Sequence, residues 1–317
     1  NVEDVNFNFN KELIHHVGEE FDQIYIDQLK KLSCQKYFEN QRSNLNIVYT
    51  PIHGTGVTVI PKALHQFGFK SVHTVEEQQE PNGNFPTVVY PNPEEREALS
   101  IAIKKAKEID ADIVFGTDPD ADRVGLVVKH KGNYEILNGN QAGSLLVYFL
   151  LKKWQQEGKL KGNEFVAKTI VTTQLIDEIC KSFNTKCFNT LTGFKYIAEL
   201  IKANEGKLTF IGGGEESYGY LIGDAVRDKD AVISTLILAE VAAWAKEQNK
   251  TLIDILADIY TEFGFYKEHL ISITKKGISG AQEIANLMDA YRNKTPEAIN
   301  GIKVVEIRDY LAQNIID

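Results

Sequence analysis

The stretch ADIVFGTDPDADRVG, residues 111–125, carries the features on which the fold assignment rests. Its first six residues are mostly apolar and end at a glycine, a pattern typical of a buried strand. Asp118, Asp120 and Asp122 then follow at alternate positions, directly before an arginine. Carboxylates this close repel one another unless a cation neutralises them. The stretch therefore predicts a strand that leads into an acidic loop.

Short β-rich runs alternate with helical patterns on both sides of this stretch, which indicates parallel sheets built from βαβ units. We expect further strands at 45–50, 70–75, 123–129, 164–170 and 207–212. We expect helices at 59–68, 93–109, 143–157, 173–183, 194–204, 230–246 and 252–264. The last segment, from 269 to 310, is predicted to form a strand, a helix and a strand, and to belong to a third unit.

Composition limits the classes of partner. The 317 residues favour more than one domain, and a net charge of -9 gives no electrostatic footprint for nucleic acid or an anionic membrane. The longest apolar run, 231–245, contains Glu240 and is shorter than a membrane span, so we expect a buried helix. The three cysteines form no disulfide framework, which fits a reducing cytoplasm.

The chain begins NVEDVNFNFN, without Met and without the basic and apolar regions of a signal peptide. We expect it to be an excised piece or a processed form of a longer protein.

The acidic loop follows a strand, and α/β proteins bind ligands at the carboxyl edge of the sheet. Three carboxylates with Pro119 between them suit one hard divalent cation, for which Mg²⁺ is the natural choice, and Arg123 suits a phosphate beside it. An EF-hand is excluded, because its glycine and glutamate positions hold Arg123 and Lys129. A haloacid-dehalogenase loop fits less well, and an acidic surface turn remains the alternative.

Three other segments carry candidate ligand groups. Glu215 and Ser217 follow three glycines in IGGGEESYGY (211–220), where they suit sugar hydroxyls. Arg227 and Lys229 precede a helix start, and Lys195 begins another, where an anion is favoured. The alternative for 211–220 is a flexible turn, and the alternative for Arg227 and Lys229 is an exposed, charged helix cap. The alternative for Lys195 is a solvated lysine.

In combination these segments resemble the α-D-phosphohexomutases, the phosphoglucomutase and phosphomannomutase family. The resemblance rests on EPNGNFPTVVYPNPEE (80–95), GTDPDADRVG (116–125), TLTGFKYI (190–197), GGGEESYG (212–219) and VRDKDAV (226–232). It implies two consecutive mixed, mainly parallel α/β/α sandwich domains, plus the beginning of a third α+β unit. The expected boundaries are 1–135 for the metal-binding domain, 136–265 for the sugar-binding domain and 266–317 for the incomplete C-terminal domain.

The resemblance also implies roles. The three aspartates would hold Mg²⁺, and Arg123 would support the phosphoryl group. Glu215 and Ser217 would bind sugar hydroxyls, while Lys195, Arg227 and Lys229 would meet substrate, and Lys229 would also serve proton transfer. The implied reaction is the interconversion of hexose 1-phosphate and hexose 6-phosphate through a phosphoserine and a bisphosphate, with glucose 1,6-bisphosphate as activator.

The chain departs from the family pattern at two motifs. No SHN sequence of the phosphoserine loop occurs, and no SGTEP-like phosphate loop occurs. We therefore expect the 317 residues to be inactive alone and to need the first and last domains of the same enzyme. The alternative is a non-catalytic sugar-phosphate binding module.

Overall fold

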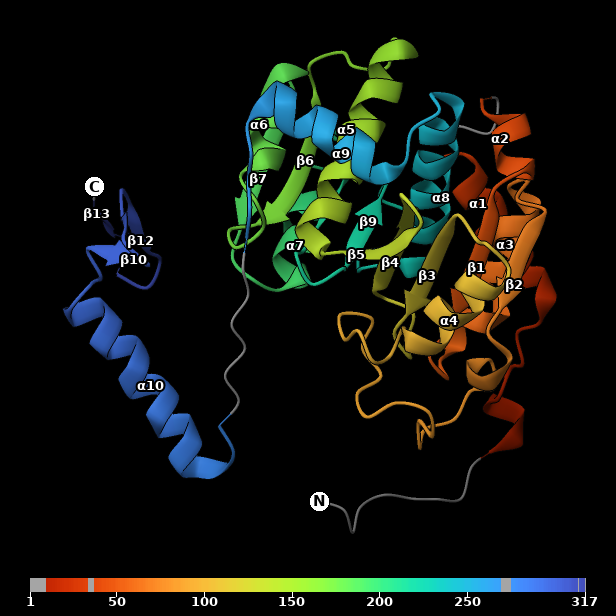
Figure 1. Cartoon of the computed structure of the whole chain (residues 1–317), viewed down its shortest axis with the longest axis horizontal. Coiled ribbons are helices and arrows are strands. Elements are labelled where there is room, and N and C mark those ends of the chain that lie inside the picture. The colour runs from red at the N-terminus through yellow and green to blue at the C-terminus, as the bar shows by residue number, and fades with distance from the viewer. Residues whose placement is uncertain (1–9, 34–36, 269–274, 313, 317) are drawn as a thin grey trace. The chain divides into compact units, whose positions relative to one another are not determined.

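The computed structural model describes residues 10–33, 37–268, 275–312 and 314–316. Contacts within the chain define two compact units, Asn1–Lys267 and Glu268–Asp317. The first unit contains two sheets and most of the helices (Figure 1).

The first sheet has five strands in the order β2-β1-β3-β4-β5. Their bounds are β1 Asn46–Thr50, β2 Ser71–Thr74, β3 Ile113–Thr117, β4 Val124–His130 and β5 Asn133–Leu137. The first three strands are parallel, and β4 and β5 continue the sheet as an antiparallel hairpin. Parallel order places the ends of β1 and β3 at one edge of the sheet, where the acidic loop begins.

The second sheet has four strands in the order β7-β6-β8-β9. Their bounds are β6 Glu164–Thr169, β7 Lys186–Thr190, β8 Thr209–Gly214 and β9 Tyr220–Ile222. Strands β6, β7 and β8 are parallel, and β9 returns antiparallel beside β8. The glycine-rich segment therefore forms the turn between β8 and β9, at the carboxyl edge of this sheet.

Helices α3 to α9 of the first unit include the expected ones, while α1 and α2, before the first strand, were not predicted. Their bounds are α1 Glu19–Lys30, α2 Glu39–Ser43, α3 Ile60–Gln66, α4 Ser100–Glu108, α5 Gly139–Gln156, α6 Leu175–Ser182, α7 Phe194–Ala203, α8 Ala231–Glu247 and α9 Leu252–Phe263. Short 3-10 turns lie at Lys11–Leu13, Thr55–Thr58 and Glu76–Gln78. Among the described helices, none combines the length and apolar character that crossing a bilayer requires.

Alternate side chains of each strand bury opposite faces of the sheets, as the period of a strand requires. In the first sheet, Val48 and Val114 pack toward α4, while Ile47 and Phe115 belong to the core that contains α8. In the second sheet, Phe165 and its neighbours pack against α7, and the other face joins the α8 core. Each sheet thus has helices on both faces, and the prediction of two mixed α/β/α sandwiches is confirmed.

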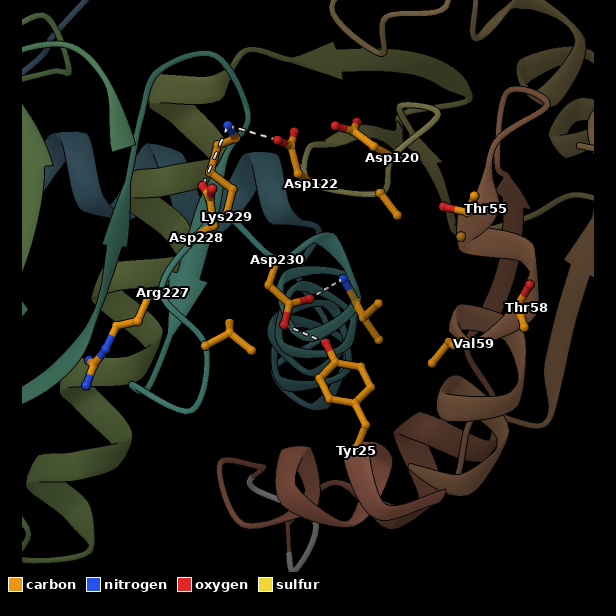
Figure 2. Close-up of a pocket in the computed structure, with 14 residues that line it drawn as sticks. Tyr25, Thr55, Thr58, Val59, Asp120, Asp122, Arg227, Asp228, Lys229 and Asp230 are labelled. Carbon is orange, nitrogen blue, oxygen red and sulfur yellow. Dashed lines mark hydrogen bonds and ion pairs between the residues drawn. The ribbon is translucent and has the colours of Figure 1, made fainter. Parts of the chain in front are cut away.

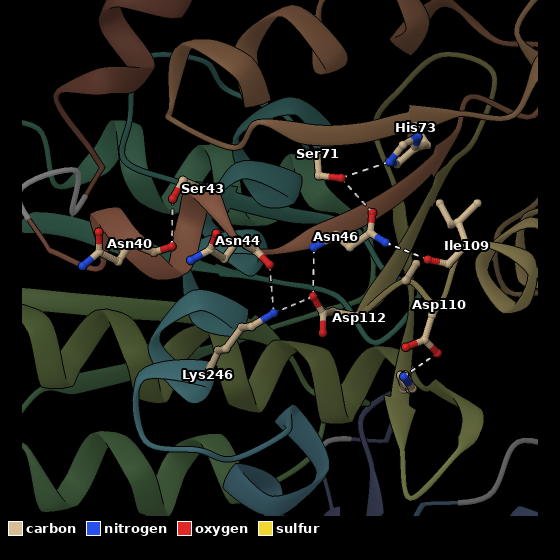
Figure 3. Close-up of polar contacts among 12 residues, drawn as sticks. Asn40, Ser43, Asn44, Asn46, Ser71, His73, Ile109, Asp110, Asp112 and Lys246 are labelled. Carbon is tan, nitrogen blue, oxygen red and sulfur yellow. Dashed lines mark hydrogen bonds and ion pairs between the residues drawn. The ribbon is translucent and has the colours of Figure 1, made fainter.

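Helix α8 packs against β3 and β4 of the first sheet and against β9 of the second (Figure 1). A polar cluster holds its C-terminal end. The Lys246 ammonium lies 2.7 Å from the Asp112 carboxylate and 2.9 Å from the Asn44 carbonyl oxygen (Figure 3). The same carboxylate accepts the backbone N–H of Asn46 at 2.8 Å. These contacts join the start of β1, the segment before β3 and the end of α8.

The second unit contains helix α10, Gly277–Asn293. Four short strands follow among its described residues: β10 Ala298–Ile299, β11 Ile302–Lys303, β12 Ile307–Asp309 and β13 Asn314–Ile316. They pair as two antiparallel hairpins, so the second strand expected within 269–310 is divided between them. The start of that segment, 269–274, where the first strand was expected, lies outside the described residues.

One further expectation was wrong in its bounds, and one strand was missed. The helix expected at 93–109 begins at Ser100, because 93–99 forms turns in which the Glu94 carboxylate pairs with Arg123 instead of starting a helix. Strand β7 was not predicted, since its sequence KCFNT contains few apolar residues. It is an edge strand that is only partly buried, so its side chains need no apolar pattern.

The buried start of α8 gives a stability prediction. Asp230 Oδ1 accepts the N–H groups of Val232 and Ile233 at 2.9 and 3.2 Å, and Oδ2 accepts the Tyr25 hydroxyl at 2.5 Å. Asp230→Ala leaves these donors without an acceptor and should lower the free energy of unfolding by about 2 kcal/mol. Chemical denaturation measures this loss. Tyr25→Phe, which removes one bond only, should cost less, and equal stability of Asp230→Ala and the parent chain would contradict the assignment.

Candidate functional site

The acidic loop begins where β3 ends and is folded around the side chain of Asp118. Its Oδ1 accepts the backbone N–H groups of Asp122 and Arg123 at 3.0 and 2.9 Å. Ala121, at the tip, has a φ of 57° in the left-handed region. The chain therefore turns back on itself within five residues, and the three carboxylates converge.

A strained turn after β1 supports this loop from one side. Ile52 and His53 have φ values of 48° and 60°, which are unusual for residues with side chains and most costly for a β-branched one. A Cβ on Gly54 would lie 2.4 Å from Cα of Pro119, so only glycine allows this approach. The Thr55 N–H then donates to the Pro119 carbonyl oxygen at 2.8 Å. The turn thus fixes the centre of the acidic loop.

Asp118, Asp120 and Asp122 each present a carboxylate oxygen within 4.8 Å of the others. Asp118 is buried, Asp122 is half-buried and Asp120 is exposed, so one side of the group is open to solvent. Burial raises the pKa of Asp118 to about 7, and the charges of Asp122 and Asp120 add to this, although the hydrogen bond from the Arg123 backbone opposes it. Three hard oxygen donors that destabilise one another's charge fit a divalent cation such as Mg²⁺.

Arg123 lies among three carboxylates. Its guanidinium is 3.4 Å from Glu94, 3.6 Å from Asp122 and 3.8 Å from Asp118. Burial raises the pKa of Glu94, while the charge of Arg123 opposes that rise. Because a guanidinium has five donors, Arg123 keeps donors available for a phosphate while Glu94 holds it.

Lys229 brings a second cation to the acidic loop from the other sheet. Its ammonium lies 2.8 Å from Asp122 Oδ2 (Figure 2). Burial lowers the pKa of Lys229, but the hydrogen bond and charge of Asp122 outweigh it, and the pKa lies above the ordinary value. Lys229 therefore remains charged, and it lies near both the acidic loop and Glu215 of the glycine-rich turn.

The glycine-rich turn between β8 and β9 places Glu215 near both cations. Its Oε1 accepts the Gly193 N–H, at the start of α7, at 3.0 Å. Burial raises the pKa of Glu215, and the Gly193 hydrogen bond and the charge of Lys229 oppose that rise. The Val124 N–H donates to the Tyr218 carbonyl oxygen at 3.1 Å, so this turn and the acidic loop are joined directly. Ser217 is half-buried in the same turn.

The other two predicted cations lie differently. The Arg227 guanidinium pairs with Glu205 at the surface, and Figure 2 shows it directed away from the acidic loop. Lys195 is exposed in the first turn of α7, with its ammonium 5.0 Å from the centre of the Tyr196 ring. The structure therefore brings Lys229 to the aspartates. It places Arg227 in the wall of the cavity beside them with its guanidinium turned to Glu205, and it leaves Lys195 exposed.

A cavity of about 730 Å³ opens beside the aspartates (Figure 2). Asp120, Asp122 and Lys229 line one side, and Thr55 and Tyr25 line another. Its wall thus combines the acidic loop with residues that the sequence reasoning did not select.

Sequence reasoning missed Glu94, Thr55 and Tyr25. Glu94 lies within EPNGNFPTVVYPNPEE, which was recognised as a family segment although its contact with Arg123 was not. Thr55 lies in the turn after β1, which was not selected as part of a site. Tyr25 lies in α1, where no motif marks it. Its contact with Asp230 joins residues far apart in the chain and becomes visible only in the structure.

Together, the fold and the site define an α/β protein in which a loop with three converging carboxylates is joined to a glycine-rich polar loop. The family of phosphoglucomutase/phosphomannomutase alpha/beta/alpha domain II matches residues 23–132, and that of domain III matches residues 138–263. The chain belongs to the phosphoglucomutase/phosphomannomutase family, the α-D-phosphohexomutases, and the predicted family is confirmed.

Relatives agree with this assignment. A phosphoglucomutase of Staphylococcus haemolyticus is 34% identical over 97% of this chain and 56% of its own length. A Haemophilus influenzae protein named "Probable phosphomannomutase" is 40% identical over 84% of this chain and 53% of its own length. The chain thus spans about half the length of the curated relatives it matches. The crystal structure of Paramecium parafusin, titled a phosphoglucomutase, shares the fold, with a TM-score of 0.62 and 17% identity over 93% of this chain and 51% of that one.

The raised pKa of Asp118 predicts pH-dependent cation binding. A divalent cation must displace the proton that Asp118 carries below a pKa of about 7. The affinity of the chain for Mg²⁺ should therefore rise as the pH increases through about 7, and level off above it. Isothermal titration calorimetry across this range measures the effect. Asp118→Asn should bind more weakly and without this pH dependence, whereas pH-independent binding by the parent chain would contradict the prediction.

Proposed function

We propose that this chain is the metal-binding and sugar-binding part of a phosphoglucomutase or phosphomannomutase that interconverts hexose 1-phosphate and hexose 6-phosphate. The observation that carries the proposal is the ion pair of 2.8 Å between Lys229 and Asp122, which joins the acidic loop to the segment beside the glycine-rich turn. A phosphate bound at the aspartates and a sugar bound at Glu215 would therefore lie close together, on either side of Lys229.

In this proposal, Asp118, Asp120 and Asp122 hold Mg²⁺. When bound there, Mg²⁺ neutralises negative charge on the phosphoryl oxygens. Arg123, held by Glu94, directs its remaining guanidinium donors to the phosphoryl group. Phosphoryl transfer depends mainly on such positioning and charge neutralisation.

The remaining site residues act on the sugar phosphate. Glu215 accepts from sugar hydroxyls and Ser217 donates to or accepts from them. Lys229, close to both loops, moves a proton at the reacting hydroxyl, while Lys195 and Arg227 supply positive charge for a phosphate from the periphery. Arg227 must leave Glu205 to do so, which its surface position allows.

The complete reaction in this proposal uses a phosphoserine and a bisphosphate intermediate, with glucose 1,6-bisphosphate as activator. The proposed units are 1–135, 136–265 and 266–317, and the partners are the remaining domains of one cytoplasmic enzyme. The 317-residue sequence contains no SHN motif for the phosphoserine. Its residues therefore position metal and sugar, while the nucleophile comes from elsewhere.

The metal assignment predicts that the triple variant Asp118→Asn, Asp120→Asn, Asp122→Asn loses Mg²⁺ binding, because amides replace all three charged ligands. Titration calorimetry with MgCl₂ measures it. The matched control is Asp228→Asn, an exposed carboxylate next to Lys229 that lies outside the triad. Equal Mg²⁺ uptake by the triple variant and the parent chain would overturn the assignment.

The 317-residue chain should not interconvert glucose 1-phosphate and glucose 6-phosphate, even with Mg²⁺ and glucose 1,6-bisphosphate, because a ping-pong transfer needs a nucleophile that its loops do not supply. A coupled dehydrogenase assay tests this. Turnover on the order of ten per second by the chain alone would contradict the prediction. Activity only in a protein that also carries the first and last domains would support the proposed function, and inactivity of that longer protein would favour a sugar-phosphate binding module.

A further inference from the structure

We infer that Glu216, between Glu215 and Ser217, is a positioning residue that seats the sugar-binding turn on a rigid platform. The platform consists of Thr169 and Thr172 at the end of β6 and of the residues that begin α5. The inference rests on the proposed function, in which Glu215 and Ser217 contact the sugar.

The Glu216 carboxylate is bound by two threonine hydroxyls. Thr169 Oγ1 and Thr172 Oγ1 lie 3.0 and 3.1 Å from Glu216 Oε2, and the two hydroxyl oxygens lie 2.7 Å from each other. Each hydroxyl has one proton, so at any moment a threonine donates either to the carboxylate or to the other hydroxyl, and the three oxygens form one hydrogen-bonded cluster. Both threonines are buried, with exposed fractions of 0% and 4%.

The backbone of Glu216 rests on the first residue of α5. A Cβ on Gly139 would lie 1.7 Å from the Glu216 carbonyl oxygen, so only glycine permits this contact. The hydroxyls of Tyr218 and Tyr220 donate to the carbonyl oxygens of Leu137 and Gly139 at 3.1 and 2.7 Å. The segment LNGNQAG (137–143) therefore starts α5 and also contacts the turn through Leu137 and Gly139.

The two parts of the platform are bonded to each other. Asn140 Oδ1, in the first turn of α5, accepts the Thr173 N–H at 2.8 Å. Asn138 caps the same helix by accepting the Gln141 N–H at 2.9 Å. The threonines and the helix start thus form one rigid element, which is the support that a precise site requires.

The side chains of Glu215 and Glu216, which are adjacent in the turn, therefore bind different partners. Glu215 reaches the Gly193 N–H and lies near Lys229, which suits a ligand-binding role. Glu216 is directed to the threonines and binds them through Oε2. Removing the threonine hydroxyls would release the Glu216 side chain, and the turn that carries Glu215 and Ser217 would lose one of its supports.

The test compares the double variant Thr169→Val, Thr172→Val, which keeps the side-chain shape, with Thr169→Ser, Thr172→Ser, which keeps the hydroxyls. Two readouts are used on the 317-residue chain. Titrations of glucose 6-phosphate, followed by NMR, and of Mg²⁺, followed by calorimetry, report the two ligand sites separately. Hydrogen exchange of the amides in 212–219 reports the order of the turn without any ligand. Thr185→Val, at a buried threonine that bonds to the Phe183 carbonyl oxygen, is the matched control.

The valine variant should weaken glucose 6-phosphate binding about tenfold and speed exchange in 212–219, with Mg²⁺ affinity unchanged. The serine variant and Thr185→Val should behave like the parent chain. Exchange and sugar binding unchanged in the valine variant would overturn the inference, and so would a parallel loss in the serine variant. If the parent chain binds neither glucose 6-phosphate nor Mg²⁺, the proposed function fails, and exchange in 212–219 still decides whether the platform orders the turn.

Discussion

Helix α8 must be buried on every side, and this requirement organises the first unit. Residues 231–245 are all buried, so the helix needs protein around its whole circumference. Neither sheet provides that alone, and α8 packs against strands of both. Its one internal acid, Glu240, is fully buried and lies 3.8 Å from Arg42 of α2. A buried charge of this kind requires its partner, so α2 is also held to the core.

The same helix sets the position of the site. Asp230 caps its start, and Lys229, one residue earlier, thereby stands opposite Asp122. The packing of α8 in the core therefore also places the charge of Lys229. The acidic loop meets two cations, Arg123 from its own sheet and Lys229 from the segment before α8. The burial of α8 thus determines where the Lys229 ammonium meets the acidic loop, at the edge of both sheets.

The sequence predicted the features that local physics controls. The apolar run before Asp118, the alternation of strands and helices, and the long apolar helix each depend on a pattern within a few residues, and the structure contains them. Features decided by distant partners were not predicted. Glu94 turns to Arg123 instead of starting a helix, and the edge strand β7 forms because β6 lies beside it. The seat of Glu216 on Gly139 joins residues that no local pattern relates.

The two loops of the site meet through main-chain atoms as well as through charges. The Val124 N–H bonds to the Tyr218 carbonyl oxygen, and the Ala231 N–H bonds to that of Ala121 at 3.0 Å. Backbone donors and acceptors belong to every residue type except for the donor that proline lacks. These two bonds therefore do not depend on any particular side chain, and proline at 124 or 231 would remove a donor. What limits the side chains at these positions is the burial of Val124, Tyr218 and Ala231 and the left-handed backbone of Ala121 and Tyr218.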